Sequence, residues 1–192
     1  MTAVIKLATL NINGITNCTR VGILTEYIRR HDLDIVFLQE ITDSELLTMP
    51  GYDIYYNIGS FMRGTAIVAR NDIALMNINK IPSGRAIAAE YNGPFIVNIK
   101  APSGTAKRAE REHFYNAEVP QLLQTRPREL IIGATSIVSL IRLTHPPTSI
   151  LAGPSPRRYV GSILPMRGRK TWPDQPIHIT LLREPAKLTE YT

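Results

Sequence analysis

The sequence predicts a mixed α/β sandwich, in which helices cover sheets of both parallel and antiparallel strands. Three observations predict it: short apolar runs recur at strand length, one follows an amphipathic segment of helical period, and an Asn-Gly pair separates two later runs. The first two indicate a strand–helix–strand unit, and the third indicates a hairpin. Chains that combine a strand–helix–strand unit with hairpins belong to the mixed α/β class.

The strand–helix–strand unit comes first in the chain. Ile5–Leu10 is a short apolar run that predicts a strand, and Thr19–Arg30 has the period of a helix. The apolar residues on one face of this helix are Val21, Leu24 and Ile28. Ile35–Leu38 is continuously apolar, which is typical of a strand buried on both faces.

The later elements follow in hairpins and one more helix. Strands are predicted at Tyr52–Tyr56, Thr65–Ala69, Arg85–Glu90, Phe95–Ile99 and Leu130–Ile132. Asn92–Gly93 predicts a tight turn between the third and fourth of these strands. A helix is predicted over Thr105–Gln124, with Pro120 kinking or restarting it.

The composition changes after Gly133. The formal net charge of the chain is +6. Residues 1–133 carry 14 Lys and Arg against 13 Asp and Glu, whereas residues 134–192 carry 8 against 3. The last 59 residues also hold eight of the 14 prolines; 137–143 is apolar there, and 177–182 could form a strand in isolation. We therefore treat 1–133 and 134–192 as separate segments, the second irregular.

The cysteine count and hydropathy favour an intracellular protein, nuclear or cytoplasmic. Cys18 is the only cysteine, so no disulfide can form within the chain. We expect no signal peptide, and no stretch reaches the roughly 18–20 apolar residues that a membrane span needs.

Two polar residues stand at the ends of the first two predicted strands. Asn11 follows KLATL and Glu40 follows DIVFLQ. Ligand sites of open α/β sheets lie beyond the carboxyl ends of strands, so these side chains are candidates for a shared metal and phosphate site. A helix cap or a solvated loop charge is the more common role of a carboxylate in such a position.

Six residue strings carry a family resemblance: LNINGI, IRRHDLDIVFLQEI, GYDIYYN, RGTAIVAR, NIKAPSG followed by KRAEREHFYN, and ELIIG. In this order, over residues 5–133, they resemble the endonuclease/exonuclease/phosphatase superfamily. The likeness is strongest to the apurinic-type endonuclease domain of non-LTR retrotransposons, which in relatives is fused to a reverse transcriptase. The resemblance implies a four-layer αββα sandwich, here incomplete, that cuts DNA phosphodiesters with Mg²⁺ or Mn²⁺.

The resemblance also implies roles for four residues. Glu40 matches the metal-binding glutamate, and Asn11 matches the asparagine that contacts the phosphate, so both are the catalytic candidates. Asn13 stands where many relatives carry Asp, which weakens any metal contact there. Lys100 stands where relatives usually carry the Tyr that helps hold the scissile phosphate; we expect Asn13 and Lys100 to bind substrate.

The other half of the family's active site is absent from the sequence. Metal-assisted hydrolysis needs a base for the attacking water and donors for the developing charge. Relatives supply them from a GDFN motif, an IDRIY-type strand and a final Asp–His pair. Here ELIIG is followed by ATSIVSL. The resemblance therefore implies a nicking endonuclease by descent that is inactive as translated.

A frameshift accounts for the loss. Residues 134–138 have codon choices that, read one nucleotide earlier, encode Gly-Asp-Phe-Asn-Cys, and residues 187–192 can likewise encode Gln-Ile-Asp-Arg-Ile-Tyr. We interpret 134–192 as an out-of-frame tail; the alternative is a lineage-specific basic tail.

A non-catalytic DNA-binding remnant that uses the basic tail is the contrasting hypothesis for function. Trp172 and the basic residues around it would serve it by stacking and charge. Lys107, Arg108 and Arg111 either touch phosphates or form a solvated helix face. Cys18 is interpreted as an incidental thiol.

Overall fold

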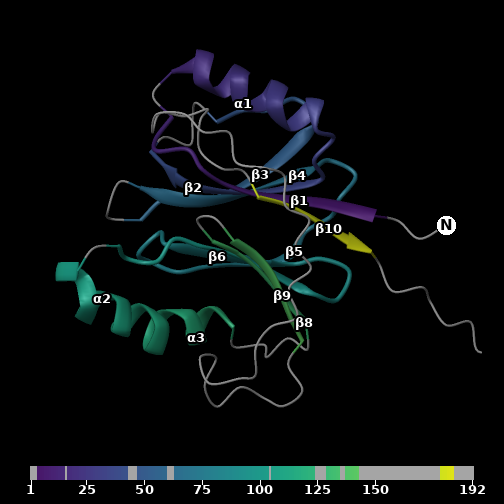
Figure 1. Ribbon diagram of the computed structural model, residues 1–192. Helices are drawn as coiled ribbons and strands as arrows, with labels where there is room; N and C mark the ends of the chain where they lie inside the picture. Colours follow the sequence, from purple (N-terminus) through teal and green to yellow (C-terminus); the bar gives the residue numbers. More distant parts are fainter. Residues whose placement is uncertain are drawn as a thin grey trace, which may run out of the picture.

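The computed structural model describes residues 4–15, 17–42, 47–59, 63–103, 105–123, 129–134, 137–142 and 178–183. They form two five-stranded sheets that lie face to face, with helices on both outer faces (Figure 1). The predicted four layers, αββα, are confirmed. No helix in these ranges has the length and apolar character needed to cross a membrane.

The first sheet has the strand order β10-β1-β2-β4-β3. Its strands are β1 (Val4–Asn11), β2 (Ile35–Ile41), β3 (Tyr52–Asn57), β4 (Gly64–Arg70) and β10 (His178–Arg183). β1 and β2 are parallel and are connected by α1 (Cys18–Arg30), whereas β4 is antiparallel to β2 and to β3. The predicted strand–helix–strand unit is therefore confirmed.

The second sheet has the order β5-β6-β7-β8-β9. Its strands are β5 (Met76–Lys80), β6 (Ala86–Glu90), β7 (Phe95–Ile99), β8 (Glu129–Ala134) and β9 (Ile137–Arg142). β6 and β7 form the predicted hairpin, and both residues of the Asn92–Gly93 turn have positive φ, at 47° and 102°. That conformation is the one in which a two-residue turn matches strand twist.

One interrupted helical segment crosses from β7 to the parallel strand β8. It comprises η1 (Thr105–Lys107), α2 (Arg108–His113), a wider turn η2 (Phe114–Glu118) and α3 (Val119–Leu122). Pro120 lies in the first turn of α3, where its missing N–H removes no helical hydrogen bond. The predicted restart at this proline is confirmed.

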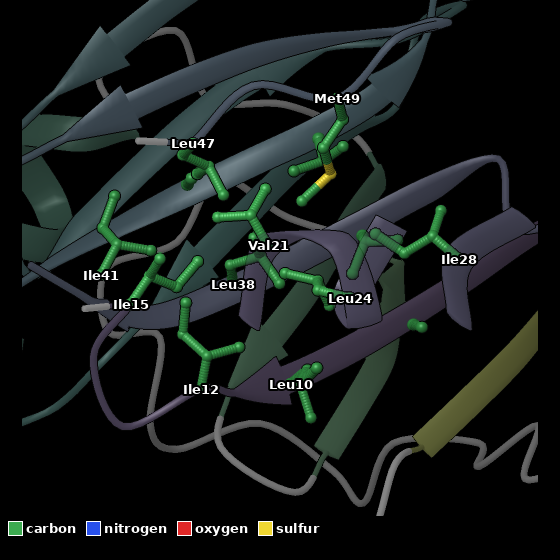
Figure 2. Close-up of a cluster of buried hydrophobic side chains, with 14 of the residues drawn as sticks. Leu10, Ile12, Ile15, Val21, Leu24, Ile28, Leu38, Ile41, Leu47 and Met49 are labelled. Atoms are coloured by element: carbon green, nitrogen blue, oxygen red, sulfur yellow. The ribbon is translucent and has the colours of Figure 1, made fainter. Parts of the chain in front are cut away.

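The apolar core fills the three spaces between the four layers. Between the sheets, Phe37, Ile67, Ile87 and Ile96 are all fully buried. Val21, Leu24 and Ile28 of α1 pack on the outer face of the first sheet, against residues such as Leu10 and Leu38 (Figure 2). The helical segment covers the second sheet in the same way through Phe114, Val119 and Leu122.

Two strands lie after Gly133: the apolar stretch 137–143, which was not predicted as a strand, contains β9, and the strand-like stretch 177–182 corresponds to β10. β9 pairs with β8 at one edge of the second sheet, and β10 pairs with β1 in the first. The other residues beyond Ala134, including Trp172, lie outside the described residues. The frameshift interpretation of 134–192 stays a prediction.

Candidate functional site

Asn11 and Glu40 come together because their strands are parallel neighbours. β1 and β2 run side by side with Asn11 opposite Gln39, so the carboxyl ends of both strands lie at the same edge of the sheet. At that edge the Asn11 Nδ2 donates a hydrogen bond to the Glu40 Oε1 over 2.9 Å. The two catalytic candidates thus form one polar pair at the carboxyl ends of their strands.

A bulge in β2 turns the Glu40 side chain toward Asn11. The register between β2 and β4 shifts between Gln39 and Ile41, so Glu40 is the extra residue. Its φ is +60°, in the left-handed region that a residue with a Cβ seldom occupies. Bulges re-aim side chains, and residues held in such a conformation gather at functional sites. The local backbone therefore singles out Glu40 independently of its sequence motif.

Two cations pair with the Glu40 carboxylate. The Lys100 Nζ lies 2.8 Å from Oε1, and the Arg63 guanidinium contacts Oε2. Lys100 follows β7 of the second sheet, whereas Arg63 precedes β4 of the first. The site is therefore assembled from both sheets, and its described residues carry two positive charges against one negative charge.

These contacts set the ionisation of the carboxyl. Burial by itself raises the pKa of Glu40, but hydrogen bonds from Lys100 and Asn11 and the charges of Lys100 and Arg63 outweigh it. The net result is a pKa below the usual value for glutamate. Glu40 is consequently an ionised acceptor at neutral pH, not a proton donor.

A buried polar network beneath the site joins the two sheets. The Gln39 Nε2 donates to the Thr9 Oγ1 over 2.8 Å and to the Asn98 Oδ1 over 2.7 Å. Gln39 directly precedes Glu40, and Asn98 stands two residues before Lys100. All three members of the network are buried. The network therefore fixes the ends of β2 and β7 relative to each other. Glu40 and Lys100 lie at these two ends and form an ion pair.

Asn13 also belongs to the site. Its backbone N–H donates to the Asn11 Oδ1 over 3.0 Å, and its own Oδ1 accepts from Arg63 over 3.2 Å. Its φ is +47°, a conformation that asparagine tolerates better than most residues. All four residues predicted from the sequence, Asn11, Asn13, Glu40 and Lys100, are thus brought together.

Arg63 is the residue that the sequence reasoning missed. The sequence contained a signal for Arg63, because this residue begins the family-like string RGTAIVAR. A strand antiparallel to β2 must start at the edge where β2 ends, and Arg63 directly precedes such a strand. The topology, once known, places Arg63 beside Glu40.

Other candidates lie in different surroundings. Lys107 and Arg108 pair with Glu110 and Glu112 of their own helical segment, at 3.5 and 2.8 Å, as residues of a solvated helix face do. Cys18 is exposed and not disulfide-bonded. It borders an open hollow of about 340 Å³ against α1, which none of the Glu40 site residues line.

The described residues do not fit a divalent metal ion. No group of three or more His, Cys, Asp or Glu side chains comes together among them. The single carboxylate of the site is paired with two cations. A divalent ion roughly 4 Å from one uncompensated positive charge is repelled by about 8 kcal/mol at an effective dielectric constant of about 20.

Fold and site together define a four-layer α/β protein with a cationic polar site at the carboxyl ends of its strands. The model of the endonuclease/exonuclease/phosphatase family matches residues 8–159. The chain belongs to this family, whose enzymes generally use divalent metals, commonly Mg²⁺. The family match extends beyond Gly133. No curated protein matches the sequence significantly.

Three solved structures illustrate the similarity in fold. Truncated TDP2 from Caenorhabditis elegans is 20% identical with a TM-score of 0.54, over 69% of this chain and 61% of that one. An AP endonuclease from Archaeoglobus fulgidus is 19% identical with a TM-score of 0.54, over 68% and 56%. The 3′ phosphatase NExo from Neisseria, bound to a product DNA hairpin, is 21% identical with a TM-score of 0.53, over 68% and 57%. The chain thus spans less than two thirds of each.

Proposed function

We propose that this chain descends from a Mg²⁺-dependent DNA-nicking endonuclease of a non-LTR retrotransposon, and that it now binds DNA phosphates without cutting them. The observation that carries the proposal is the Glu40 site itself. It keeps the polar strand-end residues of a phosphodiesterase, while its one carboxylate is paired with Arg63 and Lys100. Family membership supports an origin in phosphodiester chemistry on nucleic acids.

The exposure of the two cations suits a phosphate ligand. The Arg63 side chain is 54% exposed and the Lys100 side chain 21%. Because each donates several N–H groups and Glu40 uses only some of them, both can bind a phosphate oxygen while they keep Glu40 as a partner. Phosphate contacts of this kind give affinity without base specificity.

The first test measures binding of full-length chain to a short DNA duplex as a function of salt. Arg63→Met and Lys100→Met should each weaken binding roughly tenfold near 0.1 M salt, and each should lower the slope of log K against log salt by about one. Glu40→Gln should strengthen binding, because it removes the negative charge. Fluorescence anisotropy with a labelled duplex measures all three.

The matched control is Arg30→Met. Arg30 ends α1, which runs back from the Glu40 edge, so this variant loses the same charge at the far end of the sheet. An equal loss in Arg30→Met would show diffuse binding, and binding unchanged in all three Met variants would favour the basic residues after Gly133. Plasmid nicking with Mg²⁺ or Mn²⁺ that Glu40→Ala abolishes would instead make the chain an active endonuclease.

The retrotransposon origin has its own test in the gene. Under the proposal, the reading frame downstream of the Gly133 codon, read one nucleotide earlier, encodes a GDFN motif and then an IDRIY-type motif. Sequencing the gene from independent clones and its genomic copy decides this. A frame without either motif would establish 134–192 as a tail of the protein's own.

A further inference from the structure

The side-chain oxygens of Asn11, Asn13 and Glu40 all accept hydrogen bonds. The Glu40 Oε1 accepts from Asn11 and Lys100, and its Oε2 contacts Arg63. The Asn11 Oδ1 accepts from the Asn13 backbone N–H, and the Asn13 Oδ1 accepts from Arg63. Mg²⁺ takes six oxygen ligands in a near-ideal octahedron. To bind here, it would have to share these oxygens with their present donors, and at Glu40 it would lie beside the two cations that already pair with the carboxylate.

We infer that Lys100 and Arg63 take the place of the divalent ion at Glu40, so that this chain holds the carboxylate in an internal ion pair and loads no metal there. The inference goes beyond the proposed DNA binding and does not depend on it. It concerns the free protein and can be tested without nucleic acid.

Lys100 is the more firmly held of the two cations. Its backbone N–H donates to the Arg85 carbonyl over 2.7 Å. Its side chain is 21% exposed, and that of its partner Glu40 is 13% exposed. A largely shielded pair is weakly screened by salt, so the attraction between the groups persists at physiological ionic strength.

Arg63 completes the replacement from the other side. It reaches the second carboxylate oxygen and the side chain of Asn13, so it bridges Glu40 and Asn13. Asn13 is the position at which the family resemblance implies Asp in many relatives. An amide there brings no negative charge, so the part of the site formed by described residues has a single anion and two cations, with a net charge of +1.

The test measures Mn²⁺ binding to the full chain in the absence of DNA, by the EPR signal of free Mn²⁺ and by calorimetry. The chain should bind Mn²⁺ no more tightly than its Glu40→Gln variant. The double variant Lys100→Met/Arg63→Met frees both carboxylate oxygens of cations, so its Mn²⁺ affinity should rise at least tenfold. Adding Glu40→Gln to the double variant should remove that gain.

The control is Arg29→Met/Arg30→Met, which makes the same change in net charge at the last turn of α1 and should leave Mn²⁺ affinity unchanged. If the double variant at the site does not fold by circular dichroism, Lys100→Gln alone should still raise the affinity several-fold. A Glu40-dependent Mn²⁺ site in the unmodified chain, or no gain in the variants, would overturn the inference. Neither result bears on whether the chain binds DNA.

Discussion

Asn98→Ala is expected to lower the free energy of unfolding by about 3–4 kcal/mol. Asn98, a residue of the second sheet, is fully buried between the sheets. Both polar groups of its side chain nevertheless form hydrogen bonds. Its Nδ2 donates to the carbonyls of Leu38 and Ala66, both over 2.7 Å, and its Oδ1 accepts from Gln39. One side chain of the second sheet thereby binds two strands of the first.

The position of these bonds explains the size of the effect. Leu38 and Ala66 face each other across β2 and β4, one residue pair before the bulge that interrupts that ladder at Glu40. Truncating Asn98 removes three hydrogen bonds and leaves a cavity between layers. Each lost bond costs on the order of 1 kcal/mol, and more where a buried partner is left unsatisfied.

Urea unfolding followed by circular dichroism measures the loss, with the m-value expected to stay unchanged. Asn116→Ala is the control, because Asn116 is exposed and the same truncation there should change stability by no more than about 0.5 kcal/mol. The double variant Gln39→Leu/Asn98→Leu removes both partners, so it should lose less than the two single Leu variants together. A loss below about 1 kcal/mol in Asn98→Ala would show that the network does not hold the sheets together.

Much of the fold was predictable because its signals are local. The period of Thr19–Arg30 predicted α1, and Asn92–Gly93 predicted the β6–β7 turn. β5 was missed because three of the five residues in its segment, MNINK, are polar and most are exposed. Such a strand forms at an edge by pairing with β6, and tertiary pairing of this kind leaves little trace in local hydropathy.

Four members of the site were predictable, but Arg63 and the balance of charge were not. Asn11 and Glu40 follow strands that the pattern made parallel neighbours, so their meeting could be foreseen. The bulge at Glu40 and the approach of Lys100 depend on how the second sheet packs on the first. The Gln39–Asn98 bond that sets this packing joins residues 59 positions apart. No local spacing encodes such a contact.

Gly59→Ala is expected to cost at least about 3 kcal/mol, because two loops of different sheets touch there backbone to backbone. A Cβ on Gly59 would lie 2.2 Å from the Ser83 carbonyl carbon and 2.4 Å from the Gly84 backbone nitrogen. Backbone atoms cannot swing aside as a flexible side chain can. The contact is reinforced by Asn57, whose Nδ2 donates to the carbonyls of Ile81 and Ala86.

Alanine substitutions at three other glycines distinguish the effect of a close backbone contact from the effect of a positive φ. Gly84 has both, with φ at +75° and a Cβ position 2.2 Å from the Gly59 nitrogen, so Gly84→Ala should be the most damaging. Gly51 has φ at +89° but open space, so Gly51→Ala should cost only about 1–2 kcal/mol. Gly22 has neither restriction and lies within α1, where Gly22→Ala should stabilise by about 0.5–1 kcal/mol.

Thermal and urea unfolding of the four alanine variants should therefore rank Gly84, Gly59, Gly51 and Gly22 from the largest loss to a gain. The ranking matters for the site, because Gly59 stands four residues before Arg63 in the sequence and Gly84 directly precedes Arg85. The Arg85 carbonyl accepts the Lys100 backbone N–H, so we expect loosening of this contact to weaken the pairing of Lys100 and Arg63 with Glu40. If Gly59→Ala were as mild as Gly51→Ala, the two loops would not be in contact, and the positions of Arg63 and Lys100 would need another cause.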